Sequence, residues 1–290
     1  MSTATLENGT VPGRDSAQSL PRKRKSRASL KVLAIQLAIV VVIFGSWELL
    51  VDTGVLDHLL YGNPSGTVSQ LWVWITQGTA NGSLGLQIWI TLEEALIGFA
   101  IGTVLGIVFG IGMGRNDFMA RVLGPFIKVV NAIPRIVLAS SFVIMFGLGI
   151  TSKIMTVIVL VFFGVFFNAF QGAREVDKNF VANAQILGAS KWQVTWRVVI
   201  PSAFSWIIAS LHVAFGFALI GAIVGEFVGS QQGLGNLIKN AQGTLNQNGI
   251  WAAMVIIAVL ALIAEWLITR LERRLLRWRP AQHNSAAAEI

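Results

Sequence analysis

The side chains able to do chemistry are few and lie far apart in the sequence. The chain has no cysteine, and His58, His212 and His283 form no HxxH or HExxH pair. Thiolate nucleophiles, disulfides and iron–sulfur clusters are therefore excluded, because all of them need cysteine. Zinc sites need clustered Cys or His ligands, so no metal site is expected. The sequence predicts no catalytic residue and no metal ligand.

Polar side chains inside long apolar stretches are the second group of candidates. A polar group in such a stretch is costly, so each needs a reason. These groups are candidates for lining a path or forming a gate. The alternative for hydroxyl and amide groups is hydrogen bonding between helices, and for the carboxylate it is a structural bond to nearby backbone. The candidates are Ser140, Ser141, Asn168, Ser210, His212 and Glu226.

An enzyme working inside a membrane would need a Ser/His, paired-Asp or HExxH set. Every aspartate lies outside the apolar stretches. Ser210 and His212 are two residues apart, so they point in different directions on a helix. The phosphate-binding pattern GxxxxGK[ST] is absent, so the chain is not expected to bind ATP itself. The sequence thus disfavours an enzyme.

Composition indicates the elements that must position these groups. Of the 290 residues, 54% are apolar and 12% are charged, and the mean hydropathy is +0.68. Soluble domains carry roughly 25% charged residues, so an all-α, polytopic membrane protein is predicted. Spanning the hydrocarbon core takes roughly 20 apolar residues in a helix. Six stretches meet that length, at about 30–51, 86–112, 129–150, 153–172, 203–229 and 251–270.

The basic residues predict the orientation of these spans. Twenty of the 22 Lys and Arg residues lie in the two tails and in two alternate loops, and Lys153 and Lys239 lie on the other face. Cytosolic loops carry the basic excess, so both termini are expected in the cytosol. The positive charge is thereby explained without nucleic acid. We expect a disordered basic tail at 1–29, a membrane domain at 30–279 and a flexible tail at 280–290.

A row of glycines marks the second span. Residues four apart lie on one face of a helix, and small residues there let another helix approach closely. Two uses remain open, packing within one subunit and a moving or subunit–subunit interface. The row comprises Gly98, Gly102, Gly106, Gly110 and Gly114.

The loop at about 173–201 is the longest predicted cytosolic connection. Residues 180–187 and 192–200 have helical patterns, and Gly188 separates them. Most links between helices have 2–8 residues, so this length predicts a separate surface feature. We expect a docking site for another protein here.

This loop resembles the EAA loop of ABC-importer membrane subunits. That motif reads EAA, three residues, G, nine residues, I-x-L-P. The spacing agrees at the last alanine, the glycine and the terminal proline, whereas Ala182 and Asn183 replace the usual Glu and Ala. The resemblance implies a coupling role for Ala182, Asn183, Ala184, Leu187, Gly188, Ala189, Ser190 and Pro201. Further segments, including Phe146-Gly147-Leu148-Gly149 and Gly233-Leu234-Gly235, are similar to permeases of the nitrate, sulfonate and taurine branch.

The resemblance implies a type I ABC-importer permease fold, a multi-pass location in a bacterial inner membrane, and separate roles for several subunits. Two copies of the subunit would form the path, cytosolic ATPases carrying ATP and Mg would bind the loops, and an extracytoplasmic binding protein would deliver the solute. Glu226 could then meet that binding protein. The solute would be a small anion, with sulfonates or taurine first and nitrate next. The alternative, a stand-alone secondary transporter, would need coupling charges near the membrane midplane.

Overall fold

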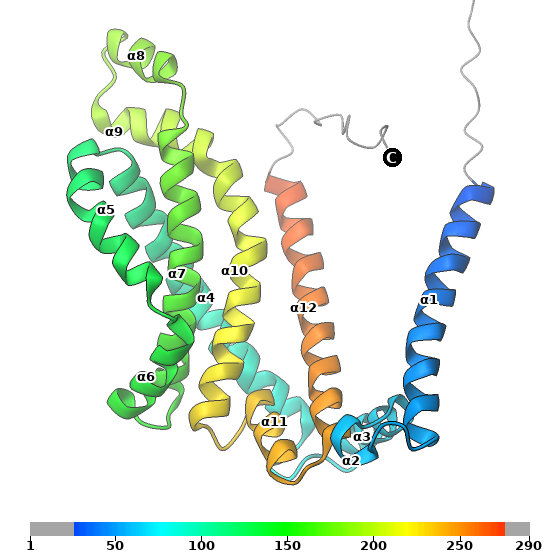
Figure 1. Ribbon diagram of the computed structural model, residues 1–290. Helices are drawn as coiled ribbons and strands as arrows, with labels where there is room; N and C mark the ends of the chain where they lie inside the picture. The colour runs from blue at the N-terminus through cyan, green and yellow to red at the C-terminus, as the bar shows by residue number, and fades with distance from the viewer. Residues whose placement is uncertain (1–25, 276–290) are drawn as a thin grey trace, which may run out of the picture. The chain divides into compact units, whose positions relative to one another are not determined.

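The computed structural model describes residues 26–275 (Figure 1). The predicted tail at 280–290 lies outside these residues, as does the tail at 1–29 except for 26–29, which begin the first helix. The chain divides after Trp47 into two units, each described by itself. A single domain over 30–279 stays a prediction.

Within the described residues every named element is helical, which confirms the all-α prediction. Five helical segments are long and apolar enough to cross a membrane. They are Lys31–Asp52, Leu84–Gly114, Ile150–Arg174, Lys191–Gly229 and Gln247–Arg274. The α-helices are α1 (Ser26–Asp52), α2 (His58–Tyr61), α3 (Pro64–Thr76), α4 (Leu84–Gly114), α5 (Asp117–Ala132), α6 (Leu138–Phe146), α7 (Ile150–Arg174), α8 (Lys178–Ile186), α9 (Lys191–Val194), α10 (Ile200–Gly229), α11 (Leu234–Gly243) and α12 (Gln247–Leu275).

The predicted span at 129–150 is wrong as one continuous helix. α5 ends at Ala132, the 3₁₀ turn Arg135–Val137 leads into α6, and the two parts are bent by 72°. Pro134 causes the break, because it lacks an N–H and disfavours a helical conformation at Ile133, whose ψ is 129°. The segment is a broken span or a re-entrant loop, so six spans are reached only if this bent pair counts as one.

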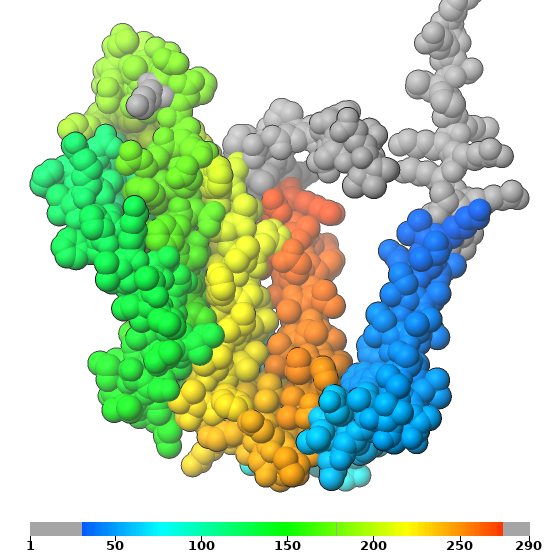
Figure 2. Space-filling view, in the orientation of Figure 1, coloured from blue at the N-terminus to red at the C-terminus, as the bar shows by residue number. Residues whose placement is uncertain are grey.

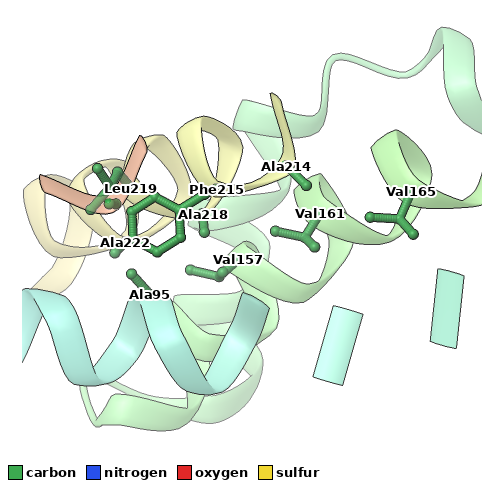
Figure 3. Close-up of a cluster of buried hydrophobic side chains, with 10 residues drawn as sticks. Ala95, Val157, Val161, Val165, Ala214, Phe215, Ala218, Leu219 and Ala222 are labelled. Atoms are coloured by element: carbon green, nitrogen blue, oxygen red, sulfur yellow. The ribbon is translucent and has the colours of Figure 1, made fainter. Parts of the chain in front are cut away.

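The apolar core lies between α4, α7 and α10. Small residues of α4 and α10 face valines of α7, as Figure 3 shows for Ala95, Ala222 and Val157. All three are fully buried. Because lipid tails are as apolar as these side chains, close packing between helices holds this core together.

The glycine row of α4 lies against α7 of the same chain. All five glycines are buried. A Cβ added to Gly102 would lie 2.9 Å from the Cβ of Val161, and one added to Gly114 would lie 2.8 Å from the Cβ of Ala173. The close approach of the two helices therefore requires glycine, which favours packing within one subunit over a subunit interface.

α10 carries a second row of glycines that the sequence analysis did not single out. A Cβ on Gly221 would lie 2.9 Å from the Cα of Val157, and one on Gly225 would lie 3.0 Å from the Cγ of Lys153, both in α7. α7 is thus the central helix, with glycine contacts to both α4 and α10.

The two ends of the bundle differ in structure. In Figure 1, α8 lies at one end and α11 at the other, and these are called the α8 end and the α11 end below. At the α11 end, Trp74 of α3, Leu234 and Leu237 of α11, and Ala253 of α12 form a buried cluster. The short helices therefore close that end of the bundle.

Candidate functional site

Two short helices at the α8 end form a hairpin, defined here as residues 178–194. Asp177 caps α8 by accepting a bond from the Asn179 N–H at 2.8 Å. Ser190 and Gln193 form a reciprocal capping box at the start of α9. Gly188 joins the helices with a φ of +81°, a value that glycine adopts without strain. The predicted helical feature with Gly188 at its turn is confirmed.

The turn of this hairpin exposes apolar side chains. Ile186 is 82% exposed and Leu187 is 87% exposed. Trp192 and Trp196 are also exposed, with ring centroids 5.4 Å apart. Figure 2 shows the hairpin as a projection beyond the ends of α5 and α7. An apolar surface on such a projection is typical of a protein-binding site.

The predicted coupling residues occupy this hairpin and the start of α10. Two of them are half-buried and the others are exposed. The half-buried residues are Ala184 and Ala189, and the exposed ones are Ala182, Asn183, Leu187, Gly188, Ser190 and Pro201.

The second half of the predicted loop is not a separate short helix that ends at Pro201. α9 continues through a π-helical turn, Thr195–Val199, into α10, so Lys191–Gly229 forms one helical segment. Pro201 lies inside this segment, directly after the π-helical turn, where the regular hydrogen-bond pattern of the α-helix is already interrupted. The predicted start of the span at 203 is therefore too late. A displacement of α9 would be carried directly into α10.

Arg115 holds the base of the hairpin. It follows the last residue of α4, and its guanidinium donates to the Thr195 hydroxyl and, at 3.0 Å, to the Lys191 carbonyl. Thr195 itself donates to the same carbonyl at 2.8 Å. Sequence reasoning missed this residue, because Arg115 was considered only as a basic loop residue.

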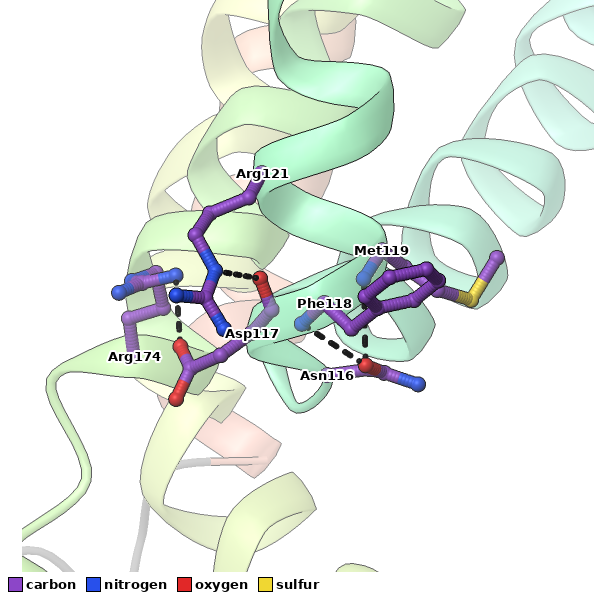
Figure 4. Close-up of polar contacts among 6 residues, drawn as sticks. All are labelled: Asn116, Asp117, Phe118, Met119, Arg121 and Arg174. Carbon is purple, nitrogen blue, oxygen red and sulfur yellow. Dashed lines mark hydrogen bonds and ion pairs between the residues drawn. The ribbon is translucent and has the colours of Figure 1, made fainter.

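A second polar contact joins α5 to α7 at this end (Figure 4). Asn116 caps α5 by accepting bonds from the backbone N–H groups of Phe118 and Met119. The Asp117 carboxylate lies 3.3 Å from the Arg174 guanidinium. Both side chains are largely exposed, so the pair contributes about 1 kcal/mol at most. A cavity of about 890 Å³ separates this region from the hairpin and includes Arg115, Ala182 and Gln185 in its lining.

The six predicted path candidates do not converge. No hydrogen bond of the described residues joins any two of them. Ser210 donates to the Ile207 carbonyl at 2.6 Å and Asn168 to the Gly164 carbonyl at 2.8 Å, both within their own helices. Ser140 and Ser141 are exposed on α6. These two hydrogen bonds and two exposed positions fit ordinary helix packing as well as a path for solute.

His212 joins α10 to α12. Its Nδ1 lies 2.7 Å from a carboxylate oxygen of Glu265, and its Nε2 lies 3.1 Å from a carboxylate oxygen of Glu272. A neutral imidazole donates through one nitrogen only, so holding both carboxylates requires the imidazolium or a protonated glutamate. The pairing was missed because Glu265 seemed sufficiently explained by reaching solvent.

Glu226 lies in a buried polar cluster at the α11 end. One carboxylate oxygen accepts from the Thr91 hydroxyl at 2.6 Å and the other accepts from the Gly235 N–H at 2.6 Å. Thr91 in turn accepts from the Leu234 N–H at 2.9 Å. Glu226 is completely buried, so these contacts favour the structural alternative over an exposed gate.

The same end buries further polar groups that sequence reasoning missed. Lys153, which was treated as a loop residue, is 1% exposed in α7, and its ammonium group donates to the Leu148 and Gly149 carbonyls. Gln87 accepts from the Gly233 N–H at 2.6 Å. Glu94 is 2% exposed. All three lie within the predicted spans at 86–112 and 153–172, and a polar residue inside an apolar stretch was the available signal.

With the hairpin and the buried cluster in place, the chain can be compared with known proteins. Residues 102–277 match the family of the binding-protein-dependent transport system inner membrane component. The match covers more than half of the chain, and the chain belongs to this family of ABC-importer permeases. The expected transport subunit is confirmed, ATP hydrolysis lies with partner subunits, and neither an enzyme nor a stand-alone carrier is supported.

Individual relatives indicate the branch of this permease family. The putative aliphatic sulfonates transport permease protein SsuC of Bacillus subtilis (strain 168) is 28% identical over 273 residues, which are 93% of this chain and 96% of that protein. The taurine transport system permease protein TauC of Escherichia coli (strain K12) is 27% identical over 259 residues, 89% of this chain and 92% of that protein. Both cover nearly the full length, in agreement with the predicted branch.

A solved structure supports the fold. The structure described as inward facing conformations of the MetNI methionine ABC transporter contains a chain that superimposes on this protein. The TM-score is 0.57 and the sequence identity is 18%. The match covers 64% of this chain and 93% of that chain. The predicted ABC-importer permease fold is confirmed.

Proposed function

We propose that this chain forms the membrane path of an ATP-driven importer for small organic sulfonates. The exposed apolar turn of the α8–α9 hairpin carries the proposal, because exposed Ile186 and Leu187 on a projecting turn are typical of a site that another protein covers. In this importer, cytosolic ATPase subunits cover that turn, and ATP and Mg bind to those subunits. A second copy of the chain completes the path, and an extracytoplasmic binding protein supplies the solute.

The distribution of charge supports an orientation with both termini in the cytosol. The α8 end carries Arg115, Arg174 and Lys191, and the end of α12 on the same side carries Arg273 and Arg274. Lys153 and Lys239 lie toward the α11 end. Two residues counted with the loops, Lys128 and Arg135, lie instead in the broken segment. The other basic residues still lie mainly at the α8 end, and this excess supports a cytosolic position for the hairpin.

The continuity of α9 and α10 supplies the coupling step. Closure of the ATPase dimer draws the two hairpins together. Because Lys191–Gly229 is one helical segment, the movement reaches the α11 end through α10. The permease then exchanges an inward-open state for an outward-open one, and ATP binding shifts the balance between them.

The solute class comes from the relatives. Permeases named for aliphatic sulfonates and for taurine match nearly the whole chain. Another relative, the formylaminopyrimidine transport permease protein ThiX of Halalkalibacterium halodurans, is 32% identical over 192 residues, 66% of this chain and 77% of that protein. The longer matches favour a sulfonate.

A glycine substitution tests the coupling role. We expect Gly188→Trp to abolish sulfonate uptake while the ATPase subunits keep basal hydrolysis, because a bulky residue with φ near +81° distorts the docking turn. Uptake and hydrolysis are measured in liposomes holding the permease, its ATPase and its binding protein. Gly54→Trp is the matched control, since Gly54 also has a positive φ of 75° and open space around it. Normal uptake by the Gly188→Trp protein contradicts the docking role.

A further inference from the structure

A histidine bridge joins α10 to α12. The imidazole of His212 in α10 lies between two carboxylates of α12, with its Nδ1 atom 2.7 Å from Glu265 and its Nε2 atom 3.1 Å from Glu272. The two glutamates are seven residues apart, which is about two helical turns, so they share one face of α12. Beside this contact a cavity of about 450 Å³ lies between the two helices, and residues of α10 and α12 line it. His212 therefore bridges an interface that is loosely packed at this level.

α10 is held differently on its other sides. Glycines bring it into close contact with α7, as Gly221 does against Val157. In the same cluster α4 and α7 supply apolar side chains, Ile107 and Val165 among them. The charged groups that act on His212 among the described residues are the two glutamates of α12. The link from α10 to α12 thus depends on charge, whereas the links to α4 and α7 depend on shape.

The bridge requires a proton. A neutral imidazole donates through one nitrogen and accepts through the other, and a carboxylate only accepts. Both carboxylates are therefore held at once only when His212 is an imidazolium or one glutamate is protonated. An imidazole ordinarily takes up a proton at about pH 6.5 and a glutamate at about pH 4.3, so the proton belongs to the histidine.

We propose that His212, as an imidazolium, is a positioning residue that makes α12 follow α10 when the ATPase displaces the hairpin. The inference rests on the proposed function and adds a condition to it, namely the proton on His212. α12 packs on α11 through Ala253 and Leu234, so a displacement of α12 reaches the α11 end along a second route. Without the proton, one carboxylate loses its donor and α10 moves past α12 at the cavity. Because the protonated form makes both contacts, coupling is strongest at low pH and weakens as the pH rises.

Nitrogen NMR of the purified chain tests the proton without transport. The chain has three histidines, and His212→Asn identifies the signals of His212 by removing them. We expect hydrogen on both ring nitrogens of His212 at about pH 7. A single ring hydrogen there overturns the proposal. So does an unchanged His212 spectrum in a protein that carries both Glu265→Gln and Glu272→Gln.

The ratio of sulfonate uptake to ATP hydrolysis in liposomes tests the positioning role. From about pH 6 to about pH 9 we expect this ratio to fall in the unmodified importer, and we expect His212→Asn to lower it about tenfold at the acidic end. His212→Lys keeps a cation throughout, since lysine ordinarily loses its proton at about pH 10.4, so its ratio should not change with pH. His58→Asn, a matched control on α2, should keep the unmodified pH profile.

The other outcomes separate this role from a place on the solute path. If His212 touched the solute, its variants would raise the solute concentration at half-maximal uptake and leave the ratio unchanged, which overturns the proposal. If neither variant folds, the NMR spectrum and the pH profile of the unmodified chain decide. Uptake without pH dependence contradicts the positioning role alone. An imidazolium in a chain that drives no ATP-dependent uptake contradicts the proposed function and the positioning role together.

Discussion

The two ends of the bundle differ in which kind of side chain is exposed and which is buried. At the α8 end, apolar side chains such as Leu187 are exposed, whereas Arg115 and the capping groups of the hairpin have hydrogen-bond partners. At the α11 end, Glu226, Glu94 and Lys153 are buried, and one oxygen of Glu94 is unpartnered. Each end thus retains one kind of unsatisfied surface.

The difference indicates what each end does. Exposed apolar area is best covered by another protein, which excludes water over a broad surface. Buried polar groups that bond to one another, as Glu226 does to Thr91 and Gly235, instead fix how the helices of one chain pack. Between the two ends, α10 runs as one helical segment from Lys191 to Gly229, and Glu226 lies three residues before its end. The same helical segment therefore joins the proposed docking hairpin to the buried polar cluster.

Loss of the Glu226 carboxylate should have the largest effect. Glu226→Ala leaves the Thr91 hydroxyl and the Gly235 N–H without an acceptor and Lys153 with less compensating charge. We expect a loss of about 3–5 kcal/mol in the free energy of unfolding, typical of breaking a buried charged contact. Denaturant unfolding of the purified permease measures it.

Glu226→Gln sharpens this prediction, because the amide keeps one acceptor. We expect its loss in the free energy of unfolding to be clearly smaller than that of Glu226→Ala. Equal stability of Glu226→Ala and the unmodified chain would mean that the buried cluster does not hold the α11 end together.

A polar substitution on the hairpin should change binding and not stability. Leu187 is 87% exposed, so Leu187→Ser removes little packing within the chain. If Leu187 fills a pocket of the ATPase, we expect a loss of about 2–4 kcal/mol in association, as for other central interface residues. Co-purification and titration of the ATPase measure it. Leu59→Ser, at the α11 end and also exposed, should leave the affinity unchanged.

If Leu187→Ser and Leu59→Ser weaken ATPase binding equally, the proposed contrast between the two ends is contradicted. A fall in the unfolding free energy of Leu187→Ser would show that this side chain packs within the chain.

Local pattern predicted much of this fold because several elements depend on nearby residues. The glycine spacing in α4 predicted a close helix contact, and Gly188 marked the turn of the hairpin. The break at Pro134 was missed because the apolar run from 129 to 150 was long enough to span a membrane. The length and hydropathy of this run indicated one span, and the tendency of Pro134 to break a helix was given too little weight.

The buried cluster could not be predicted in the same way. Thr91, Glu226 and Gly235 come from α4, α10 and α11, and their contacts depend on how the helices pack. Glu226 was recognised alone, since a carboxylate beside apolar residues is visible in the sequence. Its partners were not, because Thr91 and Gly235 are ordinary in their own helices.

The smallest expected effect concerns the link between the hairpin and α4. Arg115→Ala removes the donors to Thr195 and to the Lys191 carbonyl. Arg115 is exposed, so we expect its contacts to contribute about 1 kcal/mol. This corresponds to roughly a fivefold fall in the solute moved per ATP hydrolysed. The reason is mechanical, since a loosened hairpin absorbs part of the ATPase movement before α10 is displaced. The ratio of uptake to hydrolysis in liposomes measures it.

Thr195→Val and Arg121→Ala separate this effect from a general loss of charge. Thr195→Val keeps the shape of the side chain and removes one acceptor of Arg115, so it should lower the ratio in the same direction by a smaller factor. Arg121 donates only to the Asp117 carbonyl of its own helix among the described contacts, and Arg121→Ala should leave the ratio unchanged. If Arg121→Ala lowers the ratio as much as Arg115→Ala, positive charge at the α8 end matters and the hydrogen bonds of Arg115 to Thr195 and Lys191 do not. In that case the hairpin would depend on the ATPase, and not on α4, for its position.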